Sequence, residues 1–417
     1  MRTDLYEVTM VDTALRSGIA DRPATFEVTA RRLSEGRTYG VVAGVARVVE
    51  AIAAFRFEDG DLNWLVANGH LSPAGRHHLA RYRFRGTVDA YAEGELWYPH
   101  SPVVTVTAPF ADAVLLETLV LSILNHDSAI AAAGSRQVVA ARGRDLVEMG
   151  GRRTHEEAAI AAARAAWIVG FSATSNLAAG RRYDIPVLGT AAHAFVLAFE
   201  GRGGERAAFD AQIATMGSST TLLVDTYDVA VGIDHAVAAA RAVGATGPGG
   251  VRLDSGDAAA TSRRARTLLD TLGATDTRIV VTGDLDETEI ERLETGVGYG
   301  GERAPVDAYG VGTSLVTGAG VPTAGFVYKL VALDDPSFGV AKTSPGKEGR
   351  PGRKQAWRLP GGDEDIVGPE GEPPPPGARA LHRRVMDEGR PTGEVGDLAE
   401  ARRHHTAVLA ELTGGAP

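Results

Sequence analysis

The second half of the chain shows a repeating pattern of apolar and polar positions. From Pro186 onward, short apolar runs end in small and polar residues, and alanine- and charge-rich helical patterns follow, such as Ile233–Val243 and Ala258–Leu272. The runs start about 25 to 35 residues apart, which is the length of one βα unit. Runs that are apolar on both faces and alternate with helices predict a parallel sheet.

Polar residues that could take part in binding or catalysis directly follow these runs. Barrels and open α/β sheets place their active sites at such positions. Several such loops in succession favour a closed or nearly closed α/β barrel, because a barrel rim gathers them around one point. An open doubly wound sheet is the alternative. The runs in question include residues 220–228, 251–259, 278–287 and 307–315.

The two ends of the chain have a different pattern. The N-terminal part mixes helical segments, Leu5–Ser17 and Val41–Phe55, with strand-like pieces, and the C-terminal part is rich in proline and glycine before a predicted helix at Val395–Leu412. Neither end has enough apolar residues for a sizeable core of its own. We therefore predict one smaller α/β domain from residues 1–105 and 328–417, with the barrel at residues 106–327.

Composition excludes several classes of protein. The net charge of −10 argues against a nucleic-acid binder. The absence of cysteine excludes disulfides and cysteine nucleophiles. The most apolar long stretch, Ala108–Leu124, contains Asp112 and Glu117 and does not resemble a membrane span. We expect a cytoplasmic protein with no membrane or nucleic-acid partner.

Lysine is unevenly distributed along the chain. Among 43 basic residues only four are lysines, and all four lie within 26 residues. Lysine is a compact point charge that binds phosphate on a flexible stem. The cluster indicates a loop that binds nucleotide phosphates, with chance as the alternative. Its members are Lys329, Lys342, Lys347 and Lys354.

The segment VRLDSGD places two carboxylates and a hydroxyl on one tight loop after a strand. Arg252, Asp254 and Asp257 belong to it, and Gly256 permits a sharp turn. Such a group suits sugar hydroxyls or Mg²⁺. An ordinary Asp-Ser-Gly turn explains the same residues equally well.

Two glycine-bearing loops, TGDLDE and YGVGTS, follow the next two predicted strands. Backbone N–H groups exposed at the start of a helix form an anion site. Each loop is a weak signal alone, but in adjacent barrel units the pair predicts a phosphate site. The candidate residues are Gly283, Asp284, Gly310, Gly312 and Thr313.

Three further segments contain single candidate residues. In GTAAHAF, alanines beside His193 leave room for a phosphate at its ring, although a lone histidine is more often structural. In MGGRRTHEEA, the fork of Arg152 matches a carboxylate, although a solvated basic turn is at least as good an explanation. Tyr6 lies in TDLYEVTM, which reads as an ordinary helix start.

Taken together and in this order, the segments resemble the nicotinate phosphoribosyltransferase family. The resemblance extends from Thr3 to about Arg358 and includes GFSATSNLAAG and LLVDTYD as well. It implies a type II phosphoribosyltransferase fold, an irregular α/β barrel with a smaller domain built from both chain ends. It also implies a homodimer with active sites at the subunit interface, nicotinate and phosphoribosyl pyrophosphate as substrates, ATP as co-substrate, and Mg²⁺.

The resemblance also implies residue roles. His193 matches the histidine that ATP phosphorylates, and Arg252 and Asp254 match residues at the ribose and phosphate. Arg152 matches a residue near the pyridine ring and its acyl group, and Tyr6 one that stacks on the ring from the partner subunit. The glycine loops match those that hold the 5′-phosphate, and Lys342, Lys347 and Lys354 match a basic segment near the phosphates.

Two departures bear on the substrate. Met149 stands where relatives often have a phenylalanine that stacks on the ring, and a thioether also packs on an aromatic face. Relatives that use nicotinamide have an aspartate near Thr174–Asn176, and this chain has none, which favours the acid. Ser175 and Asp257 complete the candidate substrate-binding residues. The alternatives are a nicotinamide-using enzyme, a quinolinate phosphoribosyltransferase and a barrel without catalysis.

Overall fold

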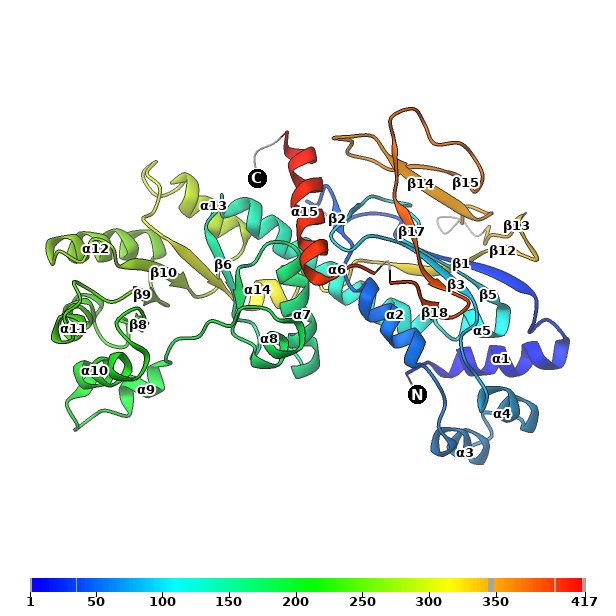
Figure 1. Cartoon of the computed structure of the whole chain (residues 1–417), viewed down its shortest axis with the longest axis horizontal. Coiled ribbons are helices and arrows are strands. Elements are labelled where there is room, and N and C mark those ends of the chain that lie inside the picture. The colour runs from blue at the N-terminus through cyan, green and yellow to red at the C-terminus, as the bar shows by residue number, and fades with distance from the viewer. Residues whose placement is uncertain (1, 35, 344–348, 394, 415–417) are drawn as a thin grey trace. The chain divides into compact units, whose positions relative to one another are not determined.

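The computed structural model describes residues 2–34, 36–343, 349–393 and 395–414 (Figure 1). The chain forms two compact units, which are described separately: unit 1 comprises Met1–Ala132 and Val321–Pro417, and unit 2 comprises Ala133–Gly320. From the sequence, the boundaries between the two domains were predicted at 105/106 and 327/328. Helix α6 (Glu117–Ala140) begins in unit 1 and ends in unit 2. Among the described residues, no helix is long and apolar enough to cross a membrane.

Unit 2 contains a six-stranded parallel sheet with the order β7-β6-β11-β10-β9-β8. Figure 1 shows α10, α11 and α12 together on one side of β8 and β9. The strands are β6 (Asp145–Glu148), β7 (Ala173–Thr174), β8 (Thr221–Leu223), β9 (Gly250–Leu253), β10 (Arg278–Thr282) and β11 (Ala308–Val311). The helices are α7 (Glu156–Ile168), α8 (Leu177–Tyr183), α9 (His193–Leu197), α10 (Gly204–Met216), α11 (Val229–Ala242), α12 (Ala258–Thr271), α13 (Glu287–Thr295) and α14 (Thr313–Val316).

The strand order is that of a barrel. Val187 forms a single parallel bridge with Thr174 beyond β7, and the next strand, β8, lies at the opposite edge of the sheet. A doubly wound sheet would instead return the chain to its middle. The predicted α/β barrel is therefore confirmed in an irregular form, a curled sheet that stays open between Val187 and β8. The strand expected from Pro186 is reduced to that bridge, because proline offers no N–H to a neighbouring strand.

Unit 1 is built around an antiparallel sheet with the order β13-β12-β1-β5-β3-β17-β18. Two smaller sheets, β15-β14-β16 and β2-β4, accompany it. The strands are β1 (Pro23–Thr29), β2 (Gly40–Val41), β3 (Thr87–Tyr91), β4 (Leu96–Trp97), β5 (Val104–Pro109), β12 (Val327–Leu333), β13 (Asp335–Gly339), β14 (Lys354–Arg358), β15 (Ile366–Pro369), β16 (Arg379–Ala380), β17 (His382–Asp387) and β18 (Arg390–Pro391). The helices are α1 (Leu5–Ser17), α2 (Val45–Ala54), α3 (Asp59–Ala67), α4 (Pro73–Leu79), α5 (Phe110–Val114) and α15 (Leu398–Thr413).

Helix predictions in unit 1 differ from the structure mainly at the ends. Helix α1 has the predicted bounds. The helix predicted over Val41–Phe55 starts later, because Val41 belongs to strand β2 and Gly44, the N-cap of α2, adopts a left-handed φ of 96° that does not fit a helix. Helix α15 begins after Asp397, whose carboxylate accepts the N–H of Glu400 at 2.6 Å.

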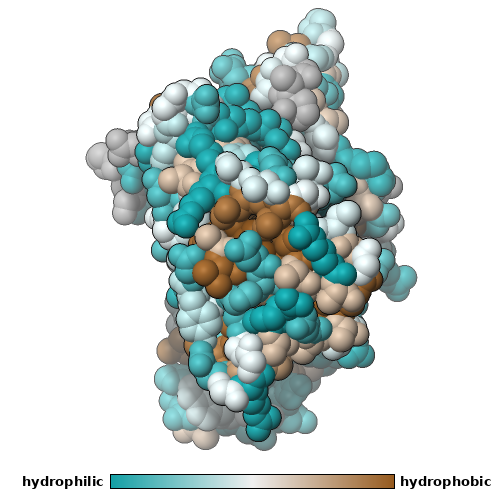
Figure 2. Space-filling model, turned by 90° about the vertical axis from the view of Figure 1, so that its left-hand side faces the viewer, coloured by the Kyte–Doolittle hydropathy of each residue, from teal (hydrophilic) through white to brown (hydrophobic). Residues whose placement is uncertain are grey.

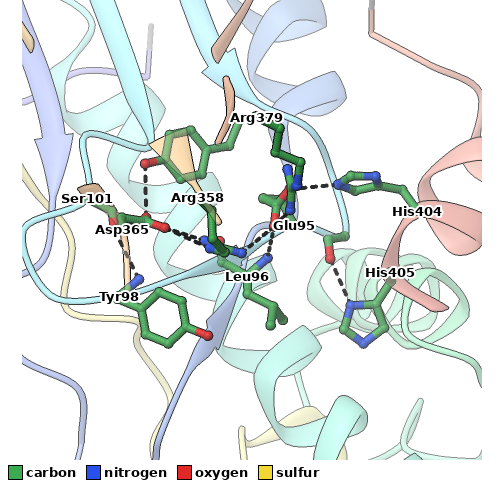
Figure 3. A network of polar contacts seen from close by, with 11 residues as sticks. Glu95, Leu96, Tyr98, Ser101, Arg358, Asp365, Arg379, His404 and His405 are labelled. Atoms are coloured by element: carbon green, nitrogen blue, oxygen red, sulfur yellow. Dashed lines mark hydrogen bonds and ion pairs between the residues drawn. The ribbon is translucent and has the colours of Figure 1, made fainter. Parts of the chain in front are cut away.

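A buried polar network joins the two ends of the chain in unit 1 (Figure 3). Glu95 accepts hydrogen bonds from Arg358 at 2.6 Å and from Arg379 at 2.6 Å, and His404 lies 2.9 Å from it. Arg358 also pairs with Asp365 at 2.5 Å. The hydrogen bonds and the arginine charges outweigh the effect of burial and lower the pKa of Glu95 to about 2. Together with the pairing of β1 with β12 and of β3 with β17, this network links the N- and C-terminal segments into one unit.

Several large apolar side chains of unit 2 remain exposed. Leu188, Leu197 and Met216 are each about half exposed. Figure 2 shows a hydrophobic area framed by hydrophilic residues on the face that it draws. Exposed apolar areas of this kind are typical of interaction surfaces.

Candidate active site

Arg252 stands at the centre of a cluster at the carboxyl ends of neighbouring strands. It lies on β9, and its guanidinium donates to Thr282 Oγ1 at 2.9 Å, Thr190 Oγ1 at 3.1 Å and Asp254 Oδ1 at 2.7 Å. The rigid fork of arginine allows three directed bonds at once. Three segments that are distant in sequence are thus joined at one point.

Asp254 follows β9 and is held as an anion. Thr282 donates a short hydrogen bond to the same oxygen that Arg252 binds. Burial raises the pKa of Asp254, but the hydrogen bonds from Thr282 and Arg252 outweigh burial, and the pKa falls below its usual range. Asp254 therefore offers a fixed negative charge and a second oxygen to a ligand.

Asp225 shapes the Asp254 loop, and sequence reasoning did not single it out. Its Oδ2 accepts the backbone N–H of Asp254 at 2.8 Å and the hydroxyl of Ser255 at 2.7 Å. Its Oδ1 is buried and has no hydrogen-bond partner among the described residues. The available signal was its position directly after β8 in LLVDTYD.

His193 is the first residue of the short helix α9. Its Nδ1 lies 3.1 Å from Thr226 Oγ1, and its Nε2 lies 3.8 Å from Asp254 Oδ2. The side chain is 39% exposed, so the ring is fixed by one hydrogen bond and remains open to a ligand. The structure therefore brings His193, Arg252 and Asp254 together.

A cavity of about 390 Å³ lies inside the curled sheet of unit 2. Small residues in its lining, such as Ala308 on β11, leave this space unfilled. Its size falls in the range of small-molecule pockets. Its lining includes Val147, Met149, Leu188, Thr190, Arg252 and Val280.

The two glycine loops follow β10 and β11, which pair directly. Gly283 has a φ of 98°, and a Cβ there would lie 2.4 Å from the carbonyl oxygen of Asp254. At Gly310 a Cβ would lie 2.7 Å from Met149 Sδ. Asp284 also has a left-handed φ, of 46°. Glycine is therefore required where these backbones approach the Asp254 loop and Met149.

Gly312 and Thr313 stand at the start of α14, where Gly312 is the N-cap. A Cβ at Gly312 would lie 3.5 Å from the carbonyl oxygen of Met149. The second glycine loop is thus next to the segment that contains Met149.

Met149 and Ser175 follow the neighbouring strands β6 and β7. Met149 is half-buried and lines the cavity, whereas Arg152 and Ser175 are exposed. The backbone N–H of Ser175 donates to the carbonyl of Glu148 at 2.8 Å, so the two loops are linked. Asp257 is exposed and caps α12 by accepting the N–H of Ala260 at 2.9 Å.

The remaining candidates belong to unit 1. Tyr6 is 45% exposed on α1, and burial together with the carboxylates of Glu117 and Glu7 raises its pKa to about 12. Lys342 is exposed, and Lys347 lies outside the described residues.

Lys354 is already engaged within unit 1. It forms an ion pair with Glu27 at 2.8 Å and donates to the carbonyls of Arg350 and Gly352. These three contacts use all three of its N–H groups. In this arrangement Lys354 contributes charge to its surroundings and no free donor.

A basic cavity of about 600 Å³ in unit 1 gathers cations that sequence reasoning only partly identified. Burial and the charges of Arg350 and Arg31 lower the pKa of His100, as expected where positive charge accumulates. The cations around this basic cavity are Arg31, Lys329, Lys342, Arg350 and Lys354.

Comparisons with known proteins agree with this geometry. The family model for the nicotinate phosphoribosyltransferase N-terminal domain matches residues 1–125, and that for the nicotinate phosphoribosyltransferase family matches residues 145–340. The nicotinate phosphoribosyltransferase pncB1 of Mycobacterium tuberculosis (strain H37Rv) is 53% identical over 99% of this chain and 91% of its own length. The nicotinate phosphoribosyltransferase of Bacillus subtilis is 38% identical over 86% of this chain and 73% of its own length.

A solved structure shows the same architecture. The crystal structure of human nicotinic acid phosphoribosyltransferase superimposes with a TM-score of 0.84 and 26% identity, covering 99% of this chain and 94% of that one. With both family models matched and relatives similar over nearly its whole length, the chain belongs to the nicotinate phosphoribosyltransferase family.

Proposed function

We propose that the chain joins nicotinate to the ribose of phosphoribosyl pyrophosphate and forms nicotinate mononucleotide for NAD salvage, with ATP phosphorylating His193. The observation that supports this best is the cluster of Arg252, Asp254 and His193 beside the cavity in unit 2. The names of the relatives point to the same reaction. We place the reaction in the cytoplasm.

The chemistry requires little from side chains beyond positioning. The pyridine nitrogen of nicotinate attacks C1 of the ribose and pyrophosphate leaves through an oxocarbenium-like transition state. That nitrogen has no proton to lose, so no general base is needed. Asp254 holds ribose hydroxyls with its free oxygen, and Arg252 fixes Asp254 in place.

ATP enters the cycle through His193. The terminal phosphoryl group of ATP moves to the imidazole, ADP leaves, and water later removes the phosphoryl group. The hydrogen bond between His193 and Thr226 fixes the ring for this transfer. The exposed ring has room for the group beside the Asp254 loop.

The glycine loops suit the 5′-phosphate. Gly283 and Asp284 follow β10, Gly310 lies near the end of the paired strand β11, and Gly312 and Thr313 start α14. Backbone N–H groups in such positions can bind an anion. The basic cavity of unit 1 suits the phosphates of pyrophosphate or ATP, with Lys342 exposed at its edge.

Mg²⁺ fits the carboxylates of this site. Buried Asp225 Oδ1 has no hydrogen-bond partner in the part of the chain that the structure describes, and Asp254 has an oxygen outside its bond with Arg252. Mg²⁺ is usually held by one or two carboxylates plus substrate phosphates. When bound, the ion would neutralise charge on the leaving pyrophosphate.

The pyridine ring and its acyl group are assigned to the loops after β6 and β7. Met149 packs on the ring, and Arg152 and Ser175 bind the carboxylate. No acidic side chain occurs in Thr174–Asn176, which favours nicotinate over nicotinamide. Nicotinamide as the substrate of the same site is the remaining alternative.

A homodimer would complete the site. We assign to Tyr6, exposed on α1, the role of stacking on the ring in the partner subunit. The exposed apolar side chains of unit 2, which include Leu188 and Leu197, suit such an interface. Sedimentation would measure the oligomeric state directly. A protein that is monomeric and active at all concentrations would contradict the proposed homodimer.

Labelling with ATP tests the phosphohistidine. The protein incubated with ATP labelled at the terminal phosphate should yield an acid-labile phosphoryl-enzyme, and His193→Ala should abolish it. His77→Ala, at an exposed histidine of unit 1, is the matched control and should keep the label. Label that persists in His193→Ala would remove this part of the proposal.

A further inference from the structure

Glu148 is a fully buried carboxylate beside the candidate pyridine loops that has no role so far. It is the last residue of β6 and is 0% exposed. Side chains alternate along a strand, so Glu148 points away from the cavity that its neighbours Val147 and Met149 line. Among the described residues no cation pairs with it, and burial raises its pKa.

The two oxygens of Glu148 bind two different segments. Oε1 accepts the backbone N–H of Gly150 at 2.5 Å, in the loop of Met149 and Arg152. Oε2 accepts the hydroxyl of Thr174 at 2.5 Å, and Thr174 is the last residue of β7, directly before Ser175. One side chain therefore connects both segments that contain the candidate acyl-binding residues.

The backbone near these contacts is equally constrained. Thr174 Oγ1 accepts the N–H of Asn176 at 3.0 Å, so the bond to Glu148 extends to the start of α8. A Cβ at Gly150 would lie 2.2 Å from Val316 Cγ1. Gly150 is thus held between Glu148 on one side and α14 on the other, with little freedom to move.

A buried carboxylate without a cation costs stability, since burial favours its neutral form and no ion pair compensates the charge. A core of apolar residues would avoid that cost. The two directed bonds, one to the loop after β6 and one to the end of β7, point to positioning as the role of this residue.

We propose that Glu148 is a positioning residue for the pyridine carboxylate: by tying Gly150 to Thr174 it fixes the distance between the loops of Arg152 and Ser175. This inference rests on the proposed function, which assigns those loops to nicotinate. It predicts that Glu148 affects the binding of nicotinate and leaves that of phosphoribosyl pyrophosphate unchanged.

Steady-state kinetics with three variants test the inference. Glu148→Ala should raise the KM for nicotinate on the order of tenfold or more, because misplaced binding groups lose affinity steeply. The KM for phosphoribosyl pyrophosphate should stay within about twofold. Glu148→Gln should restore nearly wild-type values, because its carbonyl accepts from Gly150 and its amide can donate to Thr174. Thr174→Val, which removes one of the two links, should lie between them.

Some outcomes would overturn the inference while leaving the function intact. These are an unchanged KM for nicotinate in Glu148→Ala, an equal rise of both KM values, or a Glu148→Gln variant no better than Glu148→Ala. If Glu148→Ala does not fold, Glu148→Gln and Thr174→Val still decide the question through the same ratio. A wild-type protein that makes no nicotinate mononucleotide would instead refute the proposed function.

Discussion

Replacing Asp225 by alanine should disable the site while the fold persists. The Asp225 carboxylate accepts two hydrogen bonds, from the N–H of Asp254 and the hydroxyl of Ser255. Hydrogen bonds to a charged group contribute roughly 1.5–3 kcal/mol each. The Asp254 loop is only partly buried, so the lower value applies. Losing both bonds that position the loop should reduce the stabilisation of the transition state by about 3 kcal/mol. That corresponds to about a hundredfold lower kcat/KM.

Stability should respond much less than activity to this change. Oδ1 of Asp225 is buried and has no hydrogen-bond partner among the residues described, so its removal also relieves a desolvation cost. The assay is kcat/KM for phosphoribosyl pyrophosphate at saturating nicotinate, alongside urea unfolding of both proteins.

Asp228→Ala is the matched control, because Asp228 lies in the same loop and caps α11 through the N–H groups of Ala230 and Val231. It should lose about 1 kcal/mol of stability and keep kcat/KM within a few-fold. An Asp225→Ala enzyme within threefold of wild type, or a control that loses as much activity, would refute the reasoning.

Three further predictions concern the carboxylates of Glu7 and Glu95 and the hydrogen bonds of Arg252. Burial raises the pKa of Glu7 to about 7, so ionising this carboxylate lowers the stability of the fold as the pH rises. Glu7→Gln should therefore raise the free energy of unfolding in urea by up to about 3 kcal/mol at pH 8 and leave it unchanged at pH 4. The pKa of Glu95 is lowered to about 2, so ionised Glu95 stabilises the fold above about pH 4.5, and this stabilisation is lost as the pH falls. Glu95→Gln should therefore make the free energy of unfolding less dependent on pH in acid and lower it by about 3 kcal/mol at pH 7. Arg252→Lys keeps one of the three directed hydrogen bonds of Arg252, so kcat/KM should fall by at least about tenfold. Because the pKa of Asp254 rises in this variant, the acid limb of the pH profile of kcat/KM should move to higher pH. An unchanged profile in the last case would contradict the role of Arg252.

Much of the fold could be predicted from local pattern. Helix α1 and strands β9 and β10 lie where apolar spacing placed them, because each buries a regular face. The rhythm of apolar runs also predicted the parallel sheet. The strand expected from Pro186 was wrong, because pairing there is set by proline and by the open edge of the curled sheet.

The site was predictable only in part. Residues at the end of a strand or directly after it, such as Arg252 and Asp254, were identified because parallel strands gather their ends. Asp225, Glu148 and Thr282 were missed because their roles are hydrogen bonds between segments distant in sequence. A carboxylate or hydroxyl at the end of a strand or in the loop after it has no distinctive local pattern. Lys354 was expected to bind phosphate, and only the structure shows its ion pair with Glu27.

Product analysis tests the central claim most directly. The purified protein is incubated with phosphoribosyl pyrophosphate, Mg²⁺ and ATP in the presence of equal concentrations of nicotinate and nicotinamide, and the mononucleotides are separated and quantified. The cluster of His193, Arg252 and Asp254 predicts that a mononucleotide forms, and the lack of an acidic side chain in Thr174–Asn176 predicts nicotinate mononucleotide as the main product. Nicotinamide mononucleotide as the main product, or no mononucleotide at all, would contradict the account.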